Sequence, residues 1–296
     1  MTLTIRPAEP DRLPDFVGLA AGIDLGALIT GADVAAIEAG MDRFGVLVFR
    51  DQPLTDDQQL AFSRHFGPLE QATGDFAKPE ERRLRMELND ISNLGQDNKL
   101  LPADDRRRLF SLGNMLWHSD SSFKATPAKY SLLSGRVVPP HGGNTEFADM
   151  RAAYDALDTE TRTLVADMVC DHTQIHSRGL LGFTDFTDAE RIRFAPVPQR
   201  LVRRHPVTGR RSLFLSAHAA TIHGWLIPEA RALLRDLAEA ATQREFVHAH
   251  HWRPNDLVIW DNRVTMHRAR RYPADQVRDL RRTTVADSAP TLQQAA

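Results

Sequence analysis

In the N-terminal part of the chain, the spacing of apolar residues predicts a helix, a strand and a second helix. Residues 33–42 (DVAAIEAGMD) carry apolar side chains at helical spacing, whereas residues 45–49 (GVLVF) form a short apolar run rich in branched side chains. The first pattern predicts an amphipathic helix and the second a buried strand. Thr55 and Gln58 have the spacing of a capping box, which predicts a helix that starts there and continues to about residue 65.

Strand patterns dominate the second half of the chain. Short apolar or alternating segments predict strands at residues 130–138, 144–147, 212–216, 245–252, 257–260 and 280–285. Helices are expected at 149–157, 159–169 and 228–241, the last with proline at a first-turn position. Because the helices are inserted among the strands without regular alternation, the order favours a mixed α/β fold with a double-sheet jelly roll (a double-stranded β-helix) flanked by helices. No GxGxxG or GxxxxGK[ST] motif follows these strands, so dinucleotide and P-loop sites lack support.

Between residues 71 and 112 the periodicity weakens into charged, proline- and glycine-containing sequence. A stretch of this length without periodicity is either a solvated loop or a lid over a site, and we favour the active-site lid. No repeat, low-complexity block or Gly/Ser linker divides the chain. We therefore expect one domain over residues 1–296.

Composition and charge narrow the class of protein. The 296 residues are 42% hydrophobic and 26% charged, as in globular proteins, and 37 basic against 39 acidic residues leave no positive field for nucleic acid. No apolar run approaches the roughly 20 residues of a membrane-spanning helix, and the first 25 residues lack a signal-peptide pattern. Cys170 is the single cysteine, so no intrachain disulfide forms. We expect a soluble cytoplasmic protein.

The peptide Trp117-His118-Ser119-Asp120 carries the most informative chemistry. On an extended strand His118 and Asp120 share one face, so both can reach one metal ion, and His267 is the best candidate for a second imidazole. Two imidazoles and a carboxylate leave three octahedral positions open, which favours Fe(II) over a closed zinc site. A zinc hydrolase is an alternative. With 12 histidines and 39 acidic residues in the chain, HxD by itself is a weak signal.

Two arginines follow His267 at short spacing. If residues 278–284 form a strand, Arg278, Leu280 and Arg282 share one face, and both guanidinium groups enter one pocket. Arginine forms bidentate pairs with carboxylates, so each arginine could anchor one acid group. A buried arginine of this kind requires a compensating anion, so an acidic ligand is expected. The alternative for this segment alone is a solvated basic strand.

With these residues in view, the chain resembles the taurine dioxygenase family of Fe(II)/2-oxoglutarate-dependent oxygenases, and most closely its 2,4-dichlorophenoxyacetate dioxygenase branch. The resemblance covers nearly the whole chain and rests on the blocks VLVFR, FGPLE, DISN, LWHSDSSF, GGNT, DMRAAYDAL, ATQREFV and WDNR. It implies a small-molecule enzyme that uses Fe(II), 2-oxoglutarate and O2. An aryloxyacetate would be hydroxylated next to its ether oxygen, yielding a phenol and glyoxylate together with succinate and CO2.

The resemblance also leaves alternatives open. Within the same class, the substrate could be a taurine-like alkylsulfonate or another carboxylic acid. From a different class, a jelly roll of this kind could be a metal- or ligand-binding protein without turnover. The resemblance further implies a homo-oligomer, since these are common in the family.

The resemblance implies roles for individual residues. His118, Asp120 and His267 match the iron ligands. Arg278 matches the arginine that binds the distal carboxylate of 2-oxoglutarate, assisted by Thr145. Residues that match positions near the primary substrate are Arg282, which faces its acidic group, and Asn114, His205, His218 and Lys99. Segment 71–83 departs from the branch, so Lys78 is only a loose candidate for a substrate contact.

Overall fold

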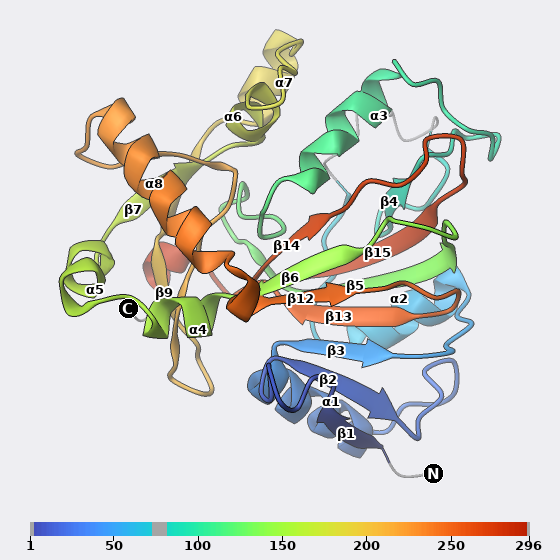
Figure 1. Ribbon diagram of the computed structural model, residues 1–296. Coiled ribbons are helices and arrows are strands. Elements are labelled where there is room, and N and C mark those ends of the chain that lie inside the picture. The colour runs from blue at the N-terminus through green and yellow to red at the C-terminus, as the bar shows by residue number, and fades with distance from the viewer. Residues whose placement is uncertain (1–2, 73–81, 295–296) are drawn as a thin grey trace.

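The computed structural model describes residues 3–72 and 82–294, and Figure 1 shows their arrangement. Its largest element is a seven-stranded sheet in the order β1-β2-β3-β13-β5-β15-β4. These strands are β1 Thr4–Pro7, β2 Val17–Ala21, β3 Val46–Phe49, β13 Leu257–Asp261, β5 Ala128–Val137, β15 Asp279–Ala286 and β4 Asn89–Ser92. Neighbouring strands are antiparallel except for the parallel pair β2 and β3.

A three-stranded antiparallel sheet, in the order β12-β6-β14, packs against the inner face of the large sheet. Its strands are β6 Thr145–Asp149, β12 Val247–His250 and β14 Thr265–Ala269. Two smaller sheets contain β7 Val169–His172, β8 Val197–Arg200, β9 Val202–Arg204, β10 Arg211–Leu213 and β11 Ala219–Ile222. The expected mixed α/β class and the strand-rich second half are confirmed.

The alternation of side chains on the central strands explains why the sequence reads there as continuous apolar runs. In β3, Val46 and Val48 pack in the core between the two sheets, while Leu47 and Phe49 pack on the opposite face. A strand that is buried on both faces has no polar positions to alternate with apolar ones. On the inter-sheet side, Phe147 of β6 lies with its ring centroid 5.4 Å from that of Trp260 in β13.

The opposite face of the large sheet is covered by the helices α1, Gly31–Phe44, and α2, Asp56–Arg64, which lie behind the sheet in Figure 1. Both predicted helices are confirmed. The side chain of Thr55 accepts a hydrogen bond from the backbone of Gln58, and the Gln58 side chain accepts one from the backbone of Thr55, so the predicted capping box is present.

Of the remaining helices, α3 lies beside β14 and β4, and the others lie around the small sheets. They are α3 Arg106–Ser111, α4 Met150–Asp155, α5 Thr159–Val165, α6 Gln174–Gly179, α7 Asp188–Arg193 and α8 Ile227–Ala241. The predicted helix 159–169 stops at Val165, because Val169 and Cys170 pair with strand β8 instead. Cys170 is buried in that strand. None of the described helices is long and apolar enough to cross a membrane.

The weakly periodic segment 71–112 contains regular structure in its described part. Strand β4 pairs with β15 at the edge of the large sheet, and α3 follows. The sequence of β4, NDIS, has no strand pattern because its half-buried side chains include only one apolar residue. Arg83 bridges this edge, since its guanidinium lies 2.7 Å from both Asp90 of β4 and Asp279 of β15. Residues 73–81, including Lys78, lie outside the described part of the chain.

We expect Thr55→Ala to lower the free energy of unfolding by about 1 kcal/mol, because the first turn of α2 loses its cap. The matched control is Thr163→Ala on the exposed side of α5, where the threonine caps no helix. This control should remain within about 0.5 kcal/mol of the parent protein. Urea unfolding of the three proteins measures both values, and an equal effect of the two substitutions would contradict the prediction.

Candidate metal centre and anion-binding residues

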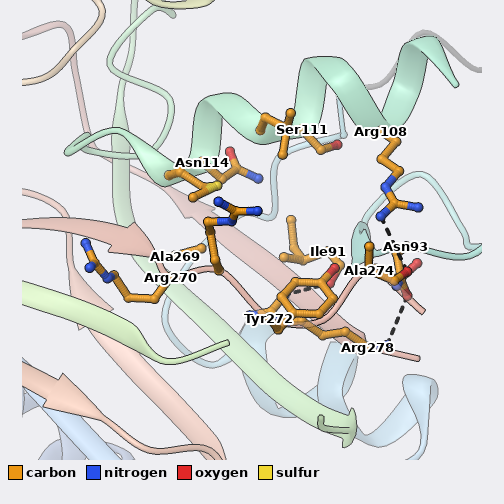
Figure 2. Close-up of a pocket in the computed structure, with 14 residues that line it drawn as sticks. Ile91, Asn93, Arg108, Ser111, Asn114, Ala269, Arg270, Tyr272, Ala274 and Arg278 are labelled. Atoms are coloured by element: carbon orange, nitrogen blue, oxygen red, sulfur yellow. Dashed lines mark hydrogen bonds between the residues drawn. The ribbon is translucent and has the colours of Figure 1, made fainter. Parts of the chain in front are cut away.

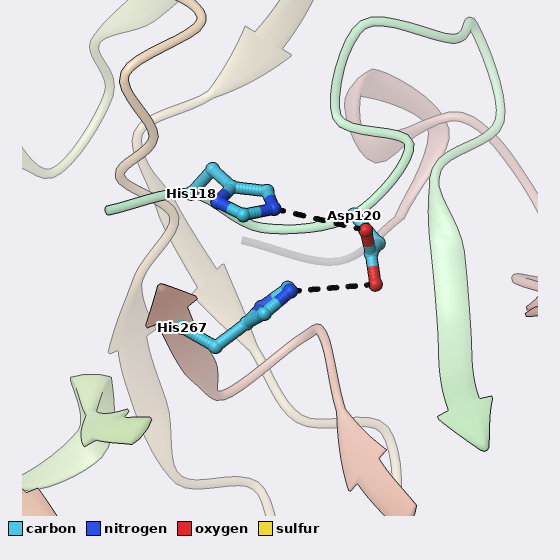
Figure 3. Close-up of side chains that lie close together, drawn as sticks. All are labelled: His118, Asp120 and His267. Atoms are coloured by element: carbon cyan, nitrogen blue, oxygen red, sulfur yellow. Dashed lines mark ion pairs between the residues drawn. The ribbon is translucent and has the colours of Figure 1, made fainter. Parts of the chain in front are cut away.

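Three side chains from two distant segments of the sequence lie close together, as Figure 3 shows. His118, Asp120 and His267 each offer a ligand atom, and these atoms lie within 4.8 Å of one another. The Nε2 atoms of His118 and His267 lie 3.9 and 3.6 Å from the two carboxylate oxygens of Asp120. All three residues are buried. Two imidazoles and one carboxylate converging on one point form a donor set suited to a divalent transition metal.

The backbone brings the two histidines together. The amide of each donates to the carbonyl of the other, with N–O distances of 3.0 and 2.8 Å, so His118 forms an isolated bridge to His267 of β14. The prediction that His118 and Asp120 share one face of a strand is wrong. The extended pairing ends with this bridge, and Asp120 begins a turn in which Ser121 has a φ of +54°.

Neutral polar groups of the large sheet orient Asp120 inside this turn. Its backbone amide donates to Oδ1 of Asn262 at 3.0 Å, and Oγ of Ser131 donates to its Oδ2 at 2.7 Å. Asn262 is held in turn, because its Nδ2 donates to Ser131 and its Oδ1 accepts from Nε1 of Trp260, both at 3.0 Å. Asn262 belongs to the WDNR block, whereas no sequence pattern points to Ser131.

Both imidazoles are held in the neutral form that metal ligation requires. Burial lowers the pKa of His118 and that of His267, although the charge of Asp120 opposes the shift. Nδ1 of His118 lies 2.7 Å from the carbonyl oxygen of Leu116. Because a carbonyl only accepts, Nδ1 carries the proton, and Nε2 presents its lone pair toward Asp120. The side chains therefore fit a metal ion on this face.

Asp120 remains ionised although it is buried. Burial alone would raise its pKa, but the positive charge of Arg282, with smaller contributions from its other neighbours, holds the pKa at about 2. Arg282 of β15 donates a hydrogen bond directly to Oδ1 of Asp120. In this arrangement the protein itself supplies an anion to Arg282, which also lines the cavity beside the three clustered side chains; its contact with the acidic group of a substrate stays a prediction.

Arg278, just before β15, is different, because it is buried without an acidic partner. It is 4% exposed, and among the described residues no carboxylate pairs with it. Its guanidinium donates to the carbonyl of Ile91 at 3.1 Å and lies 5.6 Å from the ring centroid of Tyr272, in the arrangement that Figure 2 shows. Burial lowers the pKa of Arg278. A buried cation of this kind is costly unless an anion offsets its charge, and an external acid could supply that anion.

Thr145 of β6 lines a cavity together with Arg278, His118 and His267. Nε1 of Trp252 donates to its Oγ1 at 3.0 Å. Since the oxygen already accepts this bond, the hydroxyl hydrogen of Thr145 remains available to donate to an anion. Gly142 allows the turn that leads into β6: its φ is +74°, and a Cβ atom there would lie 2.4 Å from the carbonyl oxygen of Arg271.

Of the other predicted substrate residues, the structure brings two to the site. Asn114 and His218 line a cavity with His118 and Asp120. His205 does not reach it, because its Nε2 lies 3.3 Å from Asp261 in a separate buried network. Lys99 also lies elsewhere, since its side chain is 84% exposed and nearest to Asp97. One residue that the sequence analysis missed, Arg178, lines the cavity as well.

Comparison with known proteins gives consistent matches over nearly the full chain. The family described as Taurine catabolism dioxygenase TauD, TfdA family matches residues 4–284. The alpha-ketoglutarate-dependent 2,4-dichlorophenoxyacetate dioxygenase of Cupriavidus pinatubonensis is 48% identical over 279 residues, which cover 93% of this chain and 96% of that protein. The enzyme of the same name from a Burkholderia species is 46% identical over 274 residues, which cover 92% of this chain and 91% of that protein. The crystal structure of AAD-2 with Mn(II) and N-oxalylglycine has a TM-score of 0.91 at 54% identity and covers 99% of this chain and 100% of that one.

We expect Ser131→Ala to weaken binding of Mn(II) or Co(II) by about 10-fold, because Asp120 loses a hydrogen bond that fixes its orientation. Ser212→Ala is the matched control. Ser212 is equally buried, but its hydroxyl donates to the carbonyl of Arg263, away from the three clustered side chains. Competition titration with a metal indicator measures all three affinities. Unchanged affinity in Ser131→Ala would show that Asp120 does not depend on this bond.

Proposed function

This chain belongs to the TauD, TfdA family of dioxygenases, and we propose that it is an Fe(II)- and 2-oxoglutarate-dependent dioxygenase acting on aryloxyacetates such as 2,4-dichlorophenoxyacetate. The substrate would be hydroxylated at the methylene between its ether oxygen and its carboxylate. The product is a hemiacetal that collapses to a phenol and glyoxylate, while 2-oxoglutarate is converted to succinate and CO2. The observation that carries the proposal is the convergence of His118, Asp120 and His267 beside the unpaired Arg278.

In this proposal His118, Asp120 and His267 hold the iron on one face. When bound there, the iron supplies the activation of O2 that is coupled to the oxidation of 2-oxoglutarate. The protein contributes ligand orientation: the Leu116 carbonyl fixes the tautomer of His118, and Ser131 fixes one oxygen of Asp120. The burial of all three ligands keeps bulk water away from the reacting groups.

Arg278 and Thr145 bind the distal carboxylate of 2-oxoglutarate in this proposal. Both line the cavity that also contains His118 and His267, so a short dicarboxylate can extend from the arginine to the metal ligands. A carboxylate placed there offsets the charge of a guanidinium that has no acidic partner among the described residues. Thr145 adds a hydroxyl donor at the same position.

We further propose that the two facing sheets form a double-stranded β-helix, or jelly roll, within a single domain, and that the segment 71–112 acts as a lid. The jelly roll is supported by the position of the site residues on the smaller sheet: Thr145 lies in β6, His267 lies in β14, and His118 bridges to His267. In the described part of the segment, Asp90 and Ile91 of β4 and Phe110 of α3 line the cavity over the ligands. Of these, Ile91 and Phe110 offer apolar surface that suits an aromatic ring.

The proposal is tested by supplying the purified protein with Fe(II), 2-oxoglutarate and O2 together with a panel of acids. We expect 2,4-dichlorophenoxyacetate to yield dichlorophenol, glyoxylate and succinate in equal amounts, and Asp120→Ala to yield none of them. Succinate formation only with an alkylsulfonate would replace the proposed substrate while leaving the reaction class in place. No succinate with any acid, despite metal binding, would overturn the enzymatic proposal in favour of a binding protein.

We expect Arg278→Ala to weaken the binding of 2-oxoglutarate by about 100-fold, because two charge-assisted hydrogen bonds to its carboxylate are lost. Arg235→Ala on the exposed surface of α8 is the control and should leave this affinity unchanged. Anaerobic titration of the Fe(II) protein with 2-oxoglutarate, followed by its visible absorption, gives the binding constant, and the Michaelis constant from succinate formation should rise in parallel. A normal affinity for the keto acid in Arg278→Ala would exclude this role.

A further inference from the structure

A second cavity, which we call the outer cavity, lies beside Arg278, between α3 and the segment that follows β14, as Figure 2 shows. Among the described residues its lining contains no aspartate or glutamate. It contains four arginines: Arg108, Arg270, Arg271 and Arg278. A hollow lined by charges of one sign concentrates small ions of the opposite sign.

Two of these arginines have no carboxylate that offsets their charge. Arg108 donates to two backbone carbonyls, at 3.0 and 3.4 Å, and the side chain of Arg271 is exposed. Neither forms an ion pair with a described residue. Arg270 differs, because its Nε lies 3.5 Å from Oε1 of Glu146. The outer cavity therefore carries a positive charge at its rim in addition to the charge of Arg278.

The outer cavity leads from the surface to the proposed keto-acid site. Arg271 at the rim is exposed, whereas Arg278 is only 4% exposed. The outer cavity also adjoins the cavity that contains Thr145 and the metal ligands. The residues that line both are Ile91, Asn114, Ala269 and Arg278. An anion in the outer cavity is therefore already beside the arginine that the keto acid requires.

Tyr272 lies close to both an inner and an outer cation. Its ring centroid lies 5.6 Å from the guanidinium of Arg278. Burial raises the pKa of Tyr272, and the charges of Arg278 and Arg108 oppose that rise. Its hydroxyl group has no hydrogen-bond partner in the described part of the chain. It can therefore donate to an anion that lies between the two arginines.

Backbone hydrogen bonds fix the segment 270–272, which forms one side of the rim. The amide of Gly143 donates to the carbonyl of Arg271 at 3.0 Å, and the amide of Arg270 donates to the carbonyl of Asn144 at 2.8 Å. The rim is thus held by the same turn that leads into β6. A site held by such backbone contacts keeps its charges in place before a ligand arrives.

We propose that the outer cavity is a binding site for 2-oxoglutarate, in which Arg108 and Arg271 capture the dianion before its distal carboxylate reaches Arg278. This inference rests on the proposed function, in which Arg278 holds that carboxylate in the final complex. Each unpaired cation attracts a dianion more strongly than a monoanion such as an aryloxyacetate. The cavity over the metal ligands has side chains of both signs in its lining, Glu70 and Asp90 among them, and lacks this preference.

The test separates the rate of 2-oxoglutarate binding from its affinity. The Fe(II) protein is mixed with 2-oxoglutarate without O2, and stopped-flow visible absorption follows binding. In the double variant Arg108→Gln/Arg271→Gln we expect the association rate constant to fall about 10-fold at low ionic strength. The dissociation rate constant should fall with it, so that the affinity changes by less than about 3-fold, because the final site at Arg278 is intact.

The matched control is Arg204→Gln/Arg235→Gln, which removes the same charge from exposed arginines outside the outer cavity. It should keep the association rate constant of wild type. Raising the ionic strength to about 0.5 M should bring wild type close to the double variant, because salt screens the charges at the rim. If the double variant fails to fold, Arg271→Gln at its exposed position should show a smaller effect of the same sign.

Two outcomes would overturn the outer site. One is a wild-type association rate constant in the folded variants. The other is a loss of affinity through faster dissociation, because Arg108 and Arg271 would then belong to the final binding site. The proposed function fails separately: if wild-type Fe(II) protein binds no 2-oxoglutarate, that function is wrong, and the inference with it. If wild type binds 2-oxoglutarate and forms succinate, but the variants associate at its rate, only the outer site is wrong.

Discussion

The charge of Asp120 is the constraint on which the site depends. A carboxylate buried between two sheets is costly unless its oxygens are paired and hydrogen-bonded. Here Arg282 supplies the opposite charge, Ser131 donates to the second oxygen and Asn262 accepts from the backbone amide. These three residues come from strands β15 and β5 and the turn after β13. The large sheet is therefore also the support that fixes the carboxylate for a metal ion.

The arginines around the site differ in how they are paired. Arg282 is bound to the carboxylate, and on the outer face of the same strand Arg281 pairs with Asp56 of α2 at 2.7 Å. Arg278 and Arg178 have no such partner among the described residues. Buried charges of this kind destabilise the ligand-free protein, and acidic ligands relieve that cost on binding.

Much of the framework could be predicted from local sequence. Capping of α2 depends only on Thr55 and Gln58, and the core strand β3 is recognisable because both of its faces are apolar. Strand β4 escaped prediction, because an edge strand with half-buried polar side chains has no periodic signal. Its place is set by backbone pairing with β15 and by Arg83, which are contacts between distant parts of the chain.

For the site, the sequence alone determined the types of residue and the ligand set that the motifs suggest: His118, Asp120 and His267, with Arg278 near them. The tertiary structure decided their partners. In the structure Asp120 lies in a turn and accepts a hydrogen bond from Arg282. His205 contacts Asp261 away from the site, and Arg178 lines the cavity beside His118. The reason is physical: burial and charge pairing depend on which side chains meet in space, and spacing along the chain does not specify this.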